Sequence, residues 1–230
     1  CSFAVKFSPQ TSGSKDSAIE VVTNTKTSPD SISIEGKAVI PPCNVAILGA
    51  DSYEWIVDVK NQMKQYGRFN NVDVLDVTEG PVPSLKTLQE YDAILVYSDS
   101  EFYDSEGLGD VLADYVDKGG GVVLATCDFN LPSATGSMQG RLYNDGYMPF
   151  TLGHITHGDL LTMVVDDPKH PIMKDVNSFN GGSSSYHEEI DLANGAIQLA
   201  HWSNGMPLIA YTEPGNGRVV GLNFFPVSSV

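Results

Sequence analysis

The sequence is poor in basic residues and in cysteine, and it has no long apolar run. Its 230 residues contain 13 Lys and Arg against 29 Asp and Glu, for a formal net charge of −16. This charge repels phosphate backbones and anionic lipid, so we expect neither nucleic acid nor a membrane surface as partner. No apolar run approaches the roughly 18 residues that span a bilayer, and residues 1–20 lack the pattern of a secretion signal.

Metal and phosphate motifs are missing as well. The three cysteines, Cys1, Cys43 and Cys127, form no C-x-x-C pair and no zinc-ligand spacing. The loop Gly49-Ala50-Asp51-Ser52 has one glycine where a dinucleotide fingerprint needs three, and no Walker lysine follows it. We therefore predict no metal site and no cofactor.

Residues 1–40 have the alternating pattern of β-strands. Phe3, Val5 and Phe7 lie on one face, and further strand-like runs occur at 18–22 and 32–34. The F-x-V-x-F-S-P start and the closing Ile-Ser-Ile-Glu-Gly resemble the C-terminal half of a Hydin-type, or choice-of-anchor D, immunoglobulin-like domain. Since such a sandwich needs about seven strands, we predict a partial all-β immunoglobulin-like sandwich that begins within the domain.

Pro41 and Pro42 mark a boundary, with a linker over residues 41–43 and a second domain over residues 44–230. In the second domain, continuous apolar strands alternate with amphipathic helices, which is typical of a parallel sheet covered on both faces. The sequence predicts an α/β domain with a flavodoxin-like, doubly wound parallel sheet. The predicted strands and helices begin with residues 45–48, 53–66, 72–77, 85–90, 93–97, 108–116 and 122–125, and later strands lie at 197–199, 208–211 and 218–225.

The run Gly221-Leu222-Asn223-Phe224-Phe225-Pro226-Val227 resembles the G-x-Q-F-H-P-E segment of class I glutamine amidotransferases. The resemblance covers roughly residues 43–230, and the Gly-Gly-Gly-Val-Val-Leu-Ala-Thr-Cys run that ends at Cys127 also resembles the trehalose-utilisation branch of that superfamily. Phe225 and Val227 occupy the positions of the catalytic His and Glu. The resemblance therefore implies the amidotransferase-like fold without its proton relay, which argues against an enzyme.

Cys127 stands where the resemblance places the nucleophile of the amidotransferases. Its flanks are Ala125 and Phe129 rather than the glycines of a nucleophile elbow, which favours a small buried side chain. The alternative is a Cys-dependent hydrolase or amidotransferase in which His187 and Glu189 complete a Cys-His-Glu triad with Cys127.

The loops that follow the strands form an acidic, hydroxyl-rich rim. Ligands of open α/β sheets bind beyond the carboxyl ends of the strands, so this rim predicts a carbohydrate or calcium ligand as a further alternative. The rim candidates are Asp51, Ser52, Asp99, Ser100, Glu101 and Asp128.

Together these patterns predict a non-catalytic, amidotransferase-like module of a multidomain surface or extracellular protein, with the periplasm as a variant location. Its role would be scaffolding, adhesion, or assembly into a filament or lattice. Its partners would be proteins, including copies of itself, because an incomplete sandwich exposes unpaired strand edges that another strand can complete.

Overall fold

The computed structural model describes residues 13–38, 43–132, 134 and 136–228. The chain divides into two compact units, Cys1–Pro42 and Cys43–Val230. The division falls within the segment 41–43 that the sequence suggests as a linker.

The first unit contains a β-hairpin. Strands β1 (Gly13–Val21) and β2 (Asp30–Ala38) pair antiparallel over their full length, with Ile19 opposite Ile32. Strands were expected within both segments, whereas Phe3, Val5 and Phe7 lie outside the described residues. The described part of this unit, residues 13–38, contains these two strands and no complete immunoglobulin-like sandwich.

The second unit is built on an eight-stranded sheet with the order β4-β3-β5-β6-β12-β11-β10-β8. Its five strands from β4 to β12 are parallel, and β12, β11, β10 and β8 pair antiparallel. The strands are β3 (Cys43–Ala50), β4 (Phe69–Val74), β5 (Ala93–Ser98), β6 (Gly121–Ala125), β8 (Met163–Val165), β10 (Ile197–Trp202), β11 (Pro207–Thr212) and β12 (Arg218–Leu222).

The α/β class is confirmed, but the predicted doubly wound parallel sheet is found only in five of the eight strands, since the sheet is mixed. Short turns join β10 to β11 and β11 to β12, and connections of this length permit only antiparallel pairing. A separate two-stranded sheet consists of β7 (Ile155–Thr156) and β9 (His187–Glu188).

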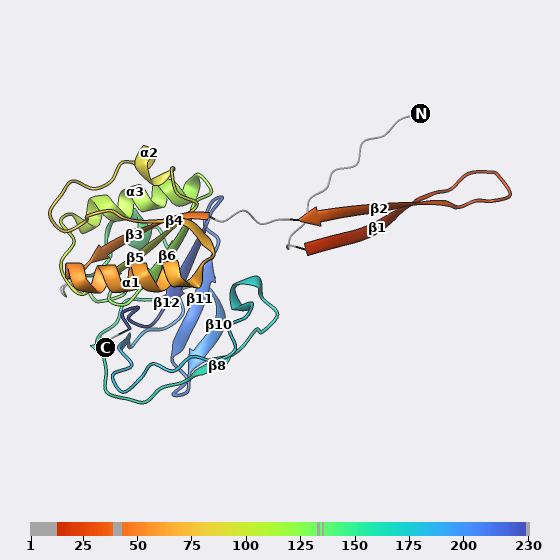
Figure 1. The fold of residues 1–230 in the computed structure, drawn as a ribbon. Coiled ribbons are helices and arrows are strands. Elements are labelled where there is room, and N and C mark those ends of the chain that lie inside the picture. Colours follow the sequence, from red (N-terminus) through yellow and green to blue (C-terminus); the bar gives the residue numbers. More distant parts are fainter. Residues whose placement is uncertain (1–12, 39–42, 133, 135, 229–230) are drawn as a thin grey trace. The chain divides into compact units, whose positions relative to one another are not determined.

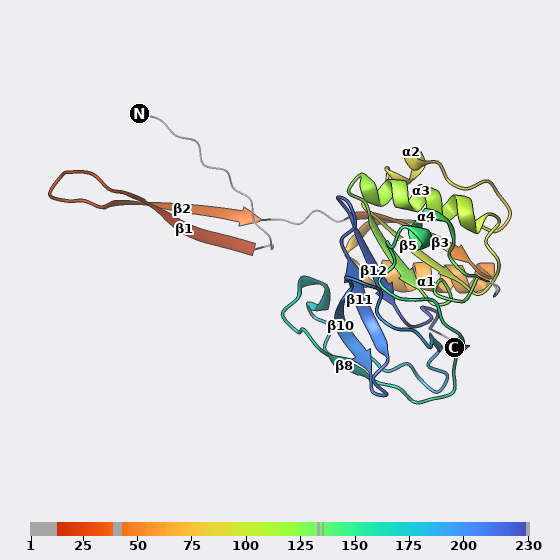
Figure 2. The same ribbon diagram turned by 180° about the vertical axis from the view of Figure 1, so that it is seen from behind.

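Helices cover both faces of the sheet, as Figures 1 and 2 show from opposite sides. Helix α1 lies against one face, and α3 lies against the other with α2 and α4 beside it. The helices are α1 (Tyr53–Tyr66), α2 (Leu85–Leu88), α3 (Ser105–Asp117), α4 (Gly140–Asn144) and the 3₁₀ helix η1 (Pro171–Met173). In the described residues, none of these helices has the length and apolar character needed to cross a membrane.

Alternate residues of β3 point to the two faces of the sheet, as a strand requires. Ile47 packs in the cluster of α1, with Ile56, while Leu48 packs in the cluster of α3, with Leu112. Both β3 residues are fully buried. The central strands therefore read as continuous apolar runs because both of their faces are covered.

Local signals set the helix boundaries. Ser52 precedes α1 with extended backbone, and Gly67 ends it in the left-handed conformation at φ 69°, which glycine adopts without strain. The Asp104 side chain accepts a hydrogen bond from the Gly107 N–H at the start of α3, as N-cap residues do. The predicted helix at 53–66 is confirmed at both ends.

Candidate functional site

The loops that follow β3, β5, β6 and β12 meet at the carboxyl edge of the parallel strands, where ligands of this fold class bind. A cavity of about 90 Å³ lies there. It is lined by Trp55, Asp99, Cys127, Ile155, Tyr186 and Phe225. This is the candidate functional site.

Cys127 lies in the wall of this cavity and is only 5% exposed. Its backbone N–H donates to Ser98 O at 2.9 Å. Burial, followed by the negative charges of Glu188 and Asp99, raises the pKa of the thiol far above its usual value. The thiol therefore stays protonated at neutral pH, whereas a nucleophilic cysteine requires the thiolate.

Asp128 and Glu188 are fully buried beside Cys127. The Thr126 hydroxyl donates to Glu188 Oε2 at 2.7 Å, while Glu188 Oε1 and both Asp128 carboxyl oxygens have no hydrogen-bond partner. Burial raises the pKa of Glu188 from 4.5 to about 8, and it raises the pKa of Asp128 well above 3.8, with the charge of Glu188 adding to the effect. Burial therefore favours the neutral, protonated form of both carboxyl groups.

The burial of Asp128 corrects its assignment to the exposed rim. The chain turns sharply after β6, where the Asp128 N–H donates to Ala125 O at 3.0 Å. The Met138 N–H donates to the Asp128 carbonyl. Phe129, which follows, is also fully buried, and its ring packs edge-on against Phe150 at 5.0 Å between centroids.

His187 and Glu189 do not form a hydrogen-bonded triad with Cys127. The buried His187 ring places Nδ1 2.5 Å from Ser185 O, and no described contact joins it to the thiol. Glu189 is exposed, and its backbone N–H donates to His154 O. The carboxyl group that approaches Cys127 belongs instead to Glu188, which the sequence interpretation missed.

Asn223 fixes the backbone behind the cavity. Its side-chain Nδ2 donates to Glu188 O at 3.0 Å and to Pro207 O at 2.9 Å, and its Oδ1 accepts from the Glu188 N–H at 2.7 Å. The indole of Trp202 donates to the Asn223 carbonyl. The polar residue of the Gly-Leu-Asn-Phe-Phe-Pro-Val run therefore has a positional role between β9 and β11.

The remaining rim candidates separate into two groups. Asp51 and Asp99 lie together at the site: burial raises the pKa of Asp51 to about 6, its hydrogen bond from the Ser52 N–H opposes that shift, and the charge of Asp99 adds to it. Ser52 and Ser100 are exposed and do not line the cavity, whereas Asp99, also exposed, does. Glu101 lines a different cavity.

Phe225 is the centre of an aromatic cluster at the cavity. Its ring centroid lies 5.7 Å from Trp55, 5.9 Å from Tyr97 and 6.4 Å from Tyr186. In the sequence, Phe225 was notable only because it occupies the position of the catalytic histidine in the amidotransferase segment that the chain resembles. Its position after the last parallel strand is a signal that it also faces the site, whereas nothing in the sequence pattern pointed to Trp55 or Tyr186.

No group of three or more His, Cys, Asp or Glu side chains in the described part of the chain could hold a metal ion. His157 packs on Tyr186 and His170 stacks on Tyr211, each at 4.9 Å between ring centroids.

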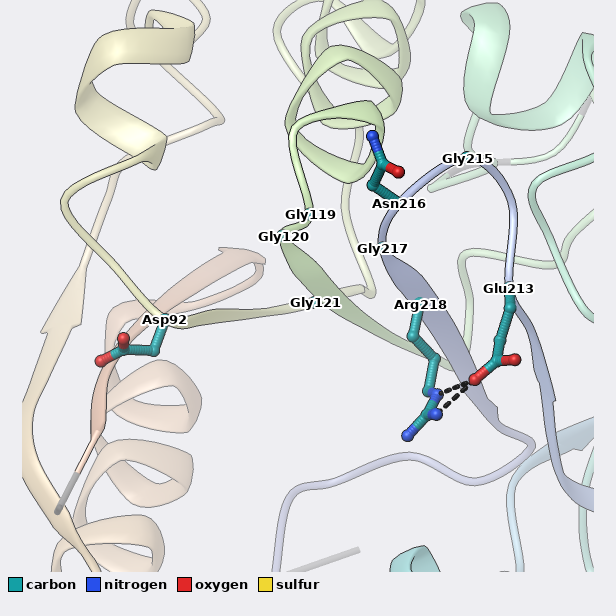
Figure 3. Close-up of a pocket in the computed structure, with 9 residues that line it drawn as sticks. All are labelled: Asp92, Gly119, Gly120, Gly121, Glu213, Gly215, Asn216, Gly217 and Arg218. Atoms are coloured by element: carbon teal, nitrogen blue, oxygen red, sulfur yellow. Dashed lines mark hydrogen bonds and ion pairs between the residues drawn. The ribbon is translucent and has the colours of Figure 1, made fainter. Parts of the chain in front are cut away.

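A larger cavity, of about 520 Å³, lies at the opposite edge of the sheet, where β6 and β12 begin (Figure 3). Its glycine-rich walls do not form an anion site, because the amides of Gly119, Gly120 and Gly217 already donate to protein carbonyls. Figure 3 shows Arg218 paired with Glu213 rather than free. These glycines permit close backbone packing.

Comparisons with known proteins show the fold alone. No family model matches the sequence, and no curated protein has significant sequence similarity to it. Among solved structures, a ThuA-like protein from Bacteroides uniformis matches with a TM-score of 0.57 and 14% identity, covering 82% of this chain and 84% of that one. The fold is therefore similar to that of ThuA-like proteins, which agrees with the amidotransferase-like resemblance.

Two proteins from Salmonella typhimurium are also similar. STM3548 matches with a TM-score of 0.55 and 13% identity over 93% of this chain and 86% of that one, and STM1381 with 0.53 and 15% over 91% and 85%. Both are named cytoplasmic proteins. This finding contradicts the expected extracellular, cell-surface or periplasmic location, and that prediction is wrong.

Proposed function

We propose that the α/β unit is a non-catalytic module of amidotransferase-like fold that binds a ligand in the cavity beside Cys127. The observation that carries this proposal is the environment of the thiol. Cys127 is buried among carboxyl groups that oppose its ionisation, and the His187 ring is turned toward Ser185 O. Phe225 and Val227 offer no proton relay.

Alkylation by iodoacetamide at neutral pH tests this proposal. We expect Cys127 to stay unmodified in the native chain and to react once the chain is unfolded, with mass spectrometry of the peptides locating each adduct. The half-buried Cys43 serves as the internal comparison, and a Cys127→Ser variant identifies the adduct. Labelling of native Cys127 faster than that of a free thiol would reveal a stabilised thiolate and favour the Cys-dependent hydrolase or amidotransferase instead.

Assembly through the first unit is a second candidate function, and one observation favours it. The β1–β2 hairpin has most of its side chains exposed, including Val22 at 80% and Ile32 at 50%, and an isolated two-stranded hairpin is at best marginally stable in water. We propose that strands of a second copy complete an immunoglobulin-like sandwich here and that the module thereby serves as a scaffold.

Sedimentation of the full chain over a wide concentration range tests this assembly. We expect association that weakens in an Ile32→Lys variant, because a charge on this strand opposes apolar packing and strand pairing. A Thr25→Lys variant in the hairpin loop adds the same charge away from the strands and should associate normally. A strictly monomeric full chain would rule out the assembly role.

A further inference from the structure

We propose that the cavity beside Cys127 binds a small organic cation, namely an ammonium group that carries methyl groups or a short alkyl chain. This inference rests on the proposed function, since it names the ligand class of the same site. Its basis is the combination of aromatic walls with carboxyl groups that lack a counter-charge.

Three of the six residues that line the cavity are aromatic. Trp55, Tyr186 and Phe225 line it, and Ile155 adds an apolar surface. The Phe225 ring packs edge-on against both of the other rings, so the cluster holds its members in fixed orientations. Ring faces carry negative electrostatic potential and attract cations within about 6 Å of the ring centre.

The charged side chain that lines the cavity, Asp99, is acidic. Asp51 lies close enough for the two charges to repel, and the buried Asp51 Oδ2 has no hydrogen-bond partner. The ion pairs found in the described residues involve Arg141, His201 and Arg218, and none reaches these two carboxyl groups. These carboxyl groups would attract a cationic ligand and repel an anionic one.

The size of the cavity limits the ligand further. A volume of about 90 Å³ equals roughly three liquid waters at ~30 Å³ each, which suits a headgroup of a few heavy atoms and not a nucleotide or an oligosaccharide. Calcium and magnesium select oxygen ligands, and a lining of three aromatic residues supplies few of them. Methylated and alkylated ammonium groups are weakly hydrated cations that aromatic surfaces favour.

Calorimetry on the unaltered chain compares choline with 3,3-dimethylbutan-1-ol, which has the same shape with carbon in place of the charged nitrogen. We expect choline to bind at least about tenfold more tightly than its neutral counterpart, because only the charged compound gains from the rings and from Asp99. Equal affinities, or no binding heat with choline, would overturn the proposal. This comparison does not depend on the folding of any variant.

Variants then locate the binding site. Phe225→Leu, Trp55→Leu and Asp99→Asn should each weaken choline binding by roughly tenfold. Tyr103→Leu and Glu90→Gln remove an exposed ring and an exposed carboxylate outside the cavity, and they should leave the affinity unchanged. Choline binding that survives the first three changes, or that falls equally in the two controls, would overturn the site assignment.

Failure of this inference is distinguishable from failure of the proposed function. If choline gives no heat and native Cys127 remains inert to alkylation, only the ligand class is wrong. If a saccharide binds and Phe225→Leu abolishes that binding, the ligand class of the site is carbohydrate rather than organic cation, and again only the ligand class is wrong. Rapid alkylation of native Cys127 would overturn the non-catalytic function itself.

Discussion

The two edges of the eight-stranded sheet, where the parallel strands begin and where they end, differ in the volume of their cavities and in the pairing of their polar groups. The edge where β6 and β12 begin has the larger cavity, about 520 Å³, yet the amides of its glycines are hydrogen-bonded and Arg218 is paired with Glu213. The edge where the parallel strands end has a cavity of only about 90 Å³, beside carboxyl oxygens that have no partner. The difference teaches that unpaired polar groups, rather than volume, identify the site in this fold.

The polar groups of the two edges also differ in their cost to the folded state. A paired amide contributes modestly to stability, while a buried unpaired carboxyl group is destabilising unless it is neutral. The site edge should therefore respond to pH and to small polar changes, whereas the opposite edge should respond chiefly to added volume. Four substitutions test this contrast.

The largest effect is expected from Asn223→Ala at the site edge. The change leaves the Glu188 N–H, the Glu188 carbonyl and the Pro207 carbonyl without their buried partner, which should lower the free energy of unfolding by roughly 3–5 kcal/mol. Denaturant unfolding measures the loss. Asn71→Ala, at an exposed asparagine, should cost less than about 0.5 kcal/mol. Equal losses in both variants would remove the special role of Asn223.

Glu188→Gln should change the pH dependence of stability. The pKa of Glu188 is about 8 in the folded chain against 4.5 normally, so only the folded chain holds this proton between those values. Stability conferred by this group therefore falls as pH rises through that window. The neutral variant should be more stable than the parent by roughly 3–4 kcal/mol at pH 9 and nearly equal to it near pH 4.5. A gain that does not vary with pH would contradict the assignment.

At the opposite edge, Gly217→Ala should destabilise through volume. A β-carbon there would overlap the Gly120 carbonyl and lie 2.5 Å from Val116 O. Because both contacts are with backbone, relief requires a shift of the chain, and we expect a loss of about 1–3 kcal/mol in thermal or denaturant unfolding. Gly80→Ala is the matched control, since no atom lies within 4 Å of its β-carbon. The loss of stability in Gly217→Ala should be independent of pH, unlike the stability difference between Glu188→Gln and the parent.

The smallest effect is expected from Arg218→Met, which removes the ion pair with Glu213 at the larger cavity. The two side chains are 43% and 56% exposed, and exposed pairs contribute about 0–1 kcal/mol. Unfolding at low and high salt should therefore differ little between the variant and the parent. A loss of several kcal/mol would mean that the Arg218–Glu213 pair stabilises this edge far more than exposed ion pairs usually do.

The sequence was most informative where boundary signals and periodicity agree. Helix α1 was predicted from its apolar spacing, and β5 and β6 from their apolar runs. The antiparallel half was harder to predict, because all six residues of β11 are buried and the strand has the continuous apolar pattern of a parallel one. Strand β4 ends at Val74 rather than at Val77, and Val77 packs in the α3 cluster from the loop that follows.

At the site, the strand ends predicted the positions of Asp51 and Asp99, but local pattern could not give side-chain direction. Asp128 turns inward after β6, and only the tertiary fold sets that direction. Strand β9 has two residues, too few for an alternation to indicate which of Glu188 and Glu189 faces Cys127. Trp55 reaches the cavity from a helix, and its contact with Phe225 joins positions far apart in the chain.

The carboxyl groups around Cys127 also bear on the engineering of a catalytic site. A Phe225→His change would place an imidazole at the cavity, but Glu188, Asp99, Asp128 and Asp51 would still oppose the thiolate. The imidazole would instead gain a proton from this acidic surrounding. An engineered nucleophile at Cys127 would therefore require the removal of carboxyl groups before a histidine is added, so the order of substitutions, and not their number alone, would decide whether the design succeeds.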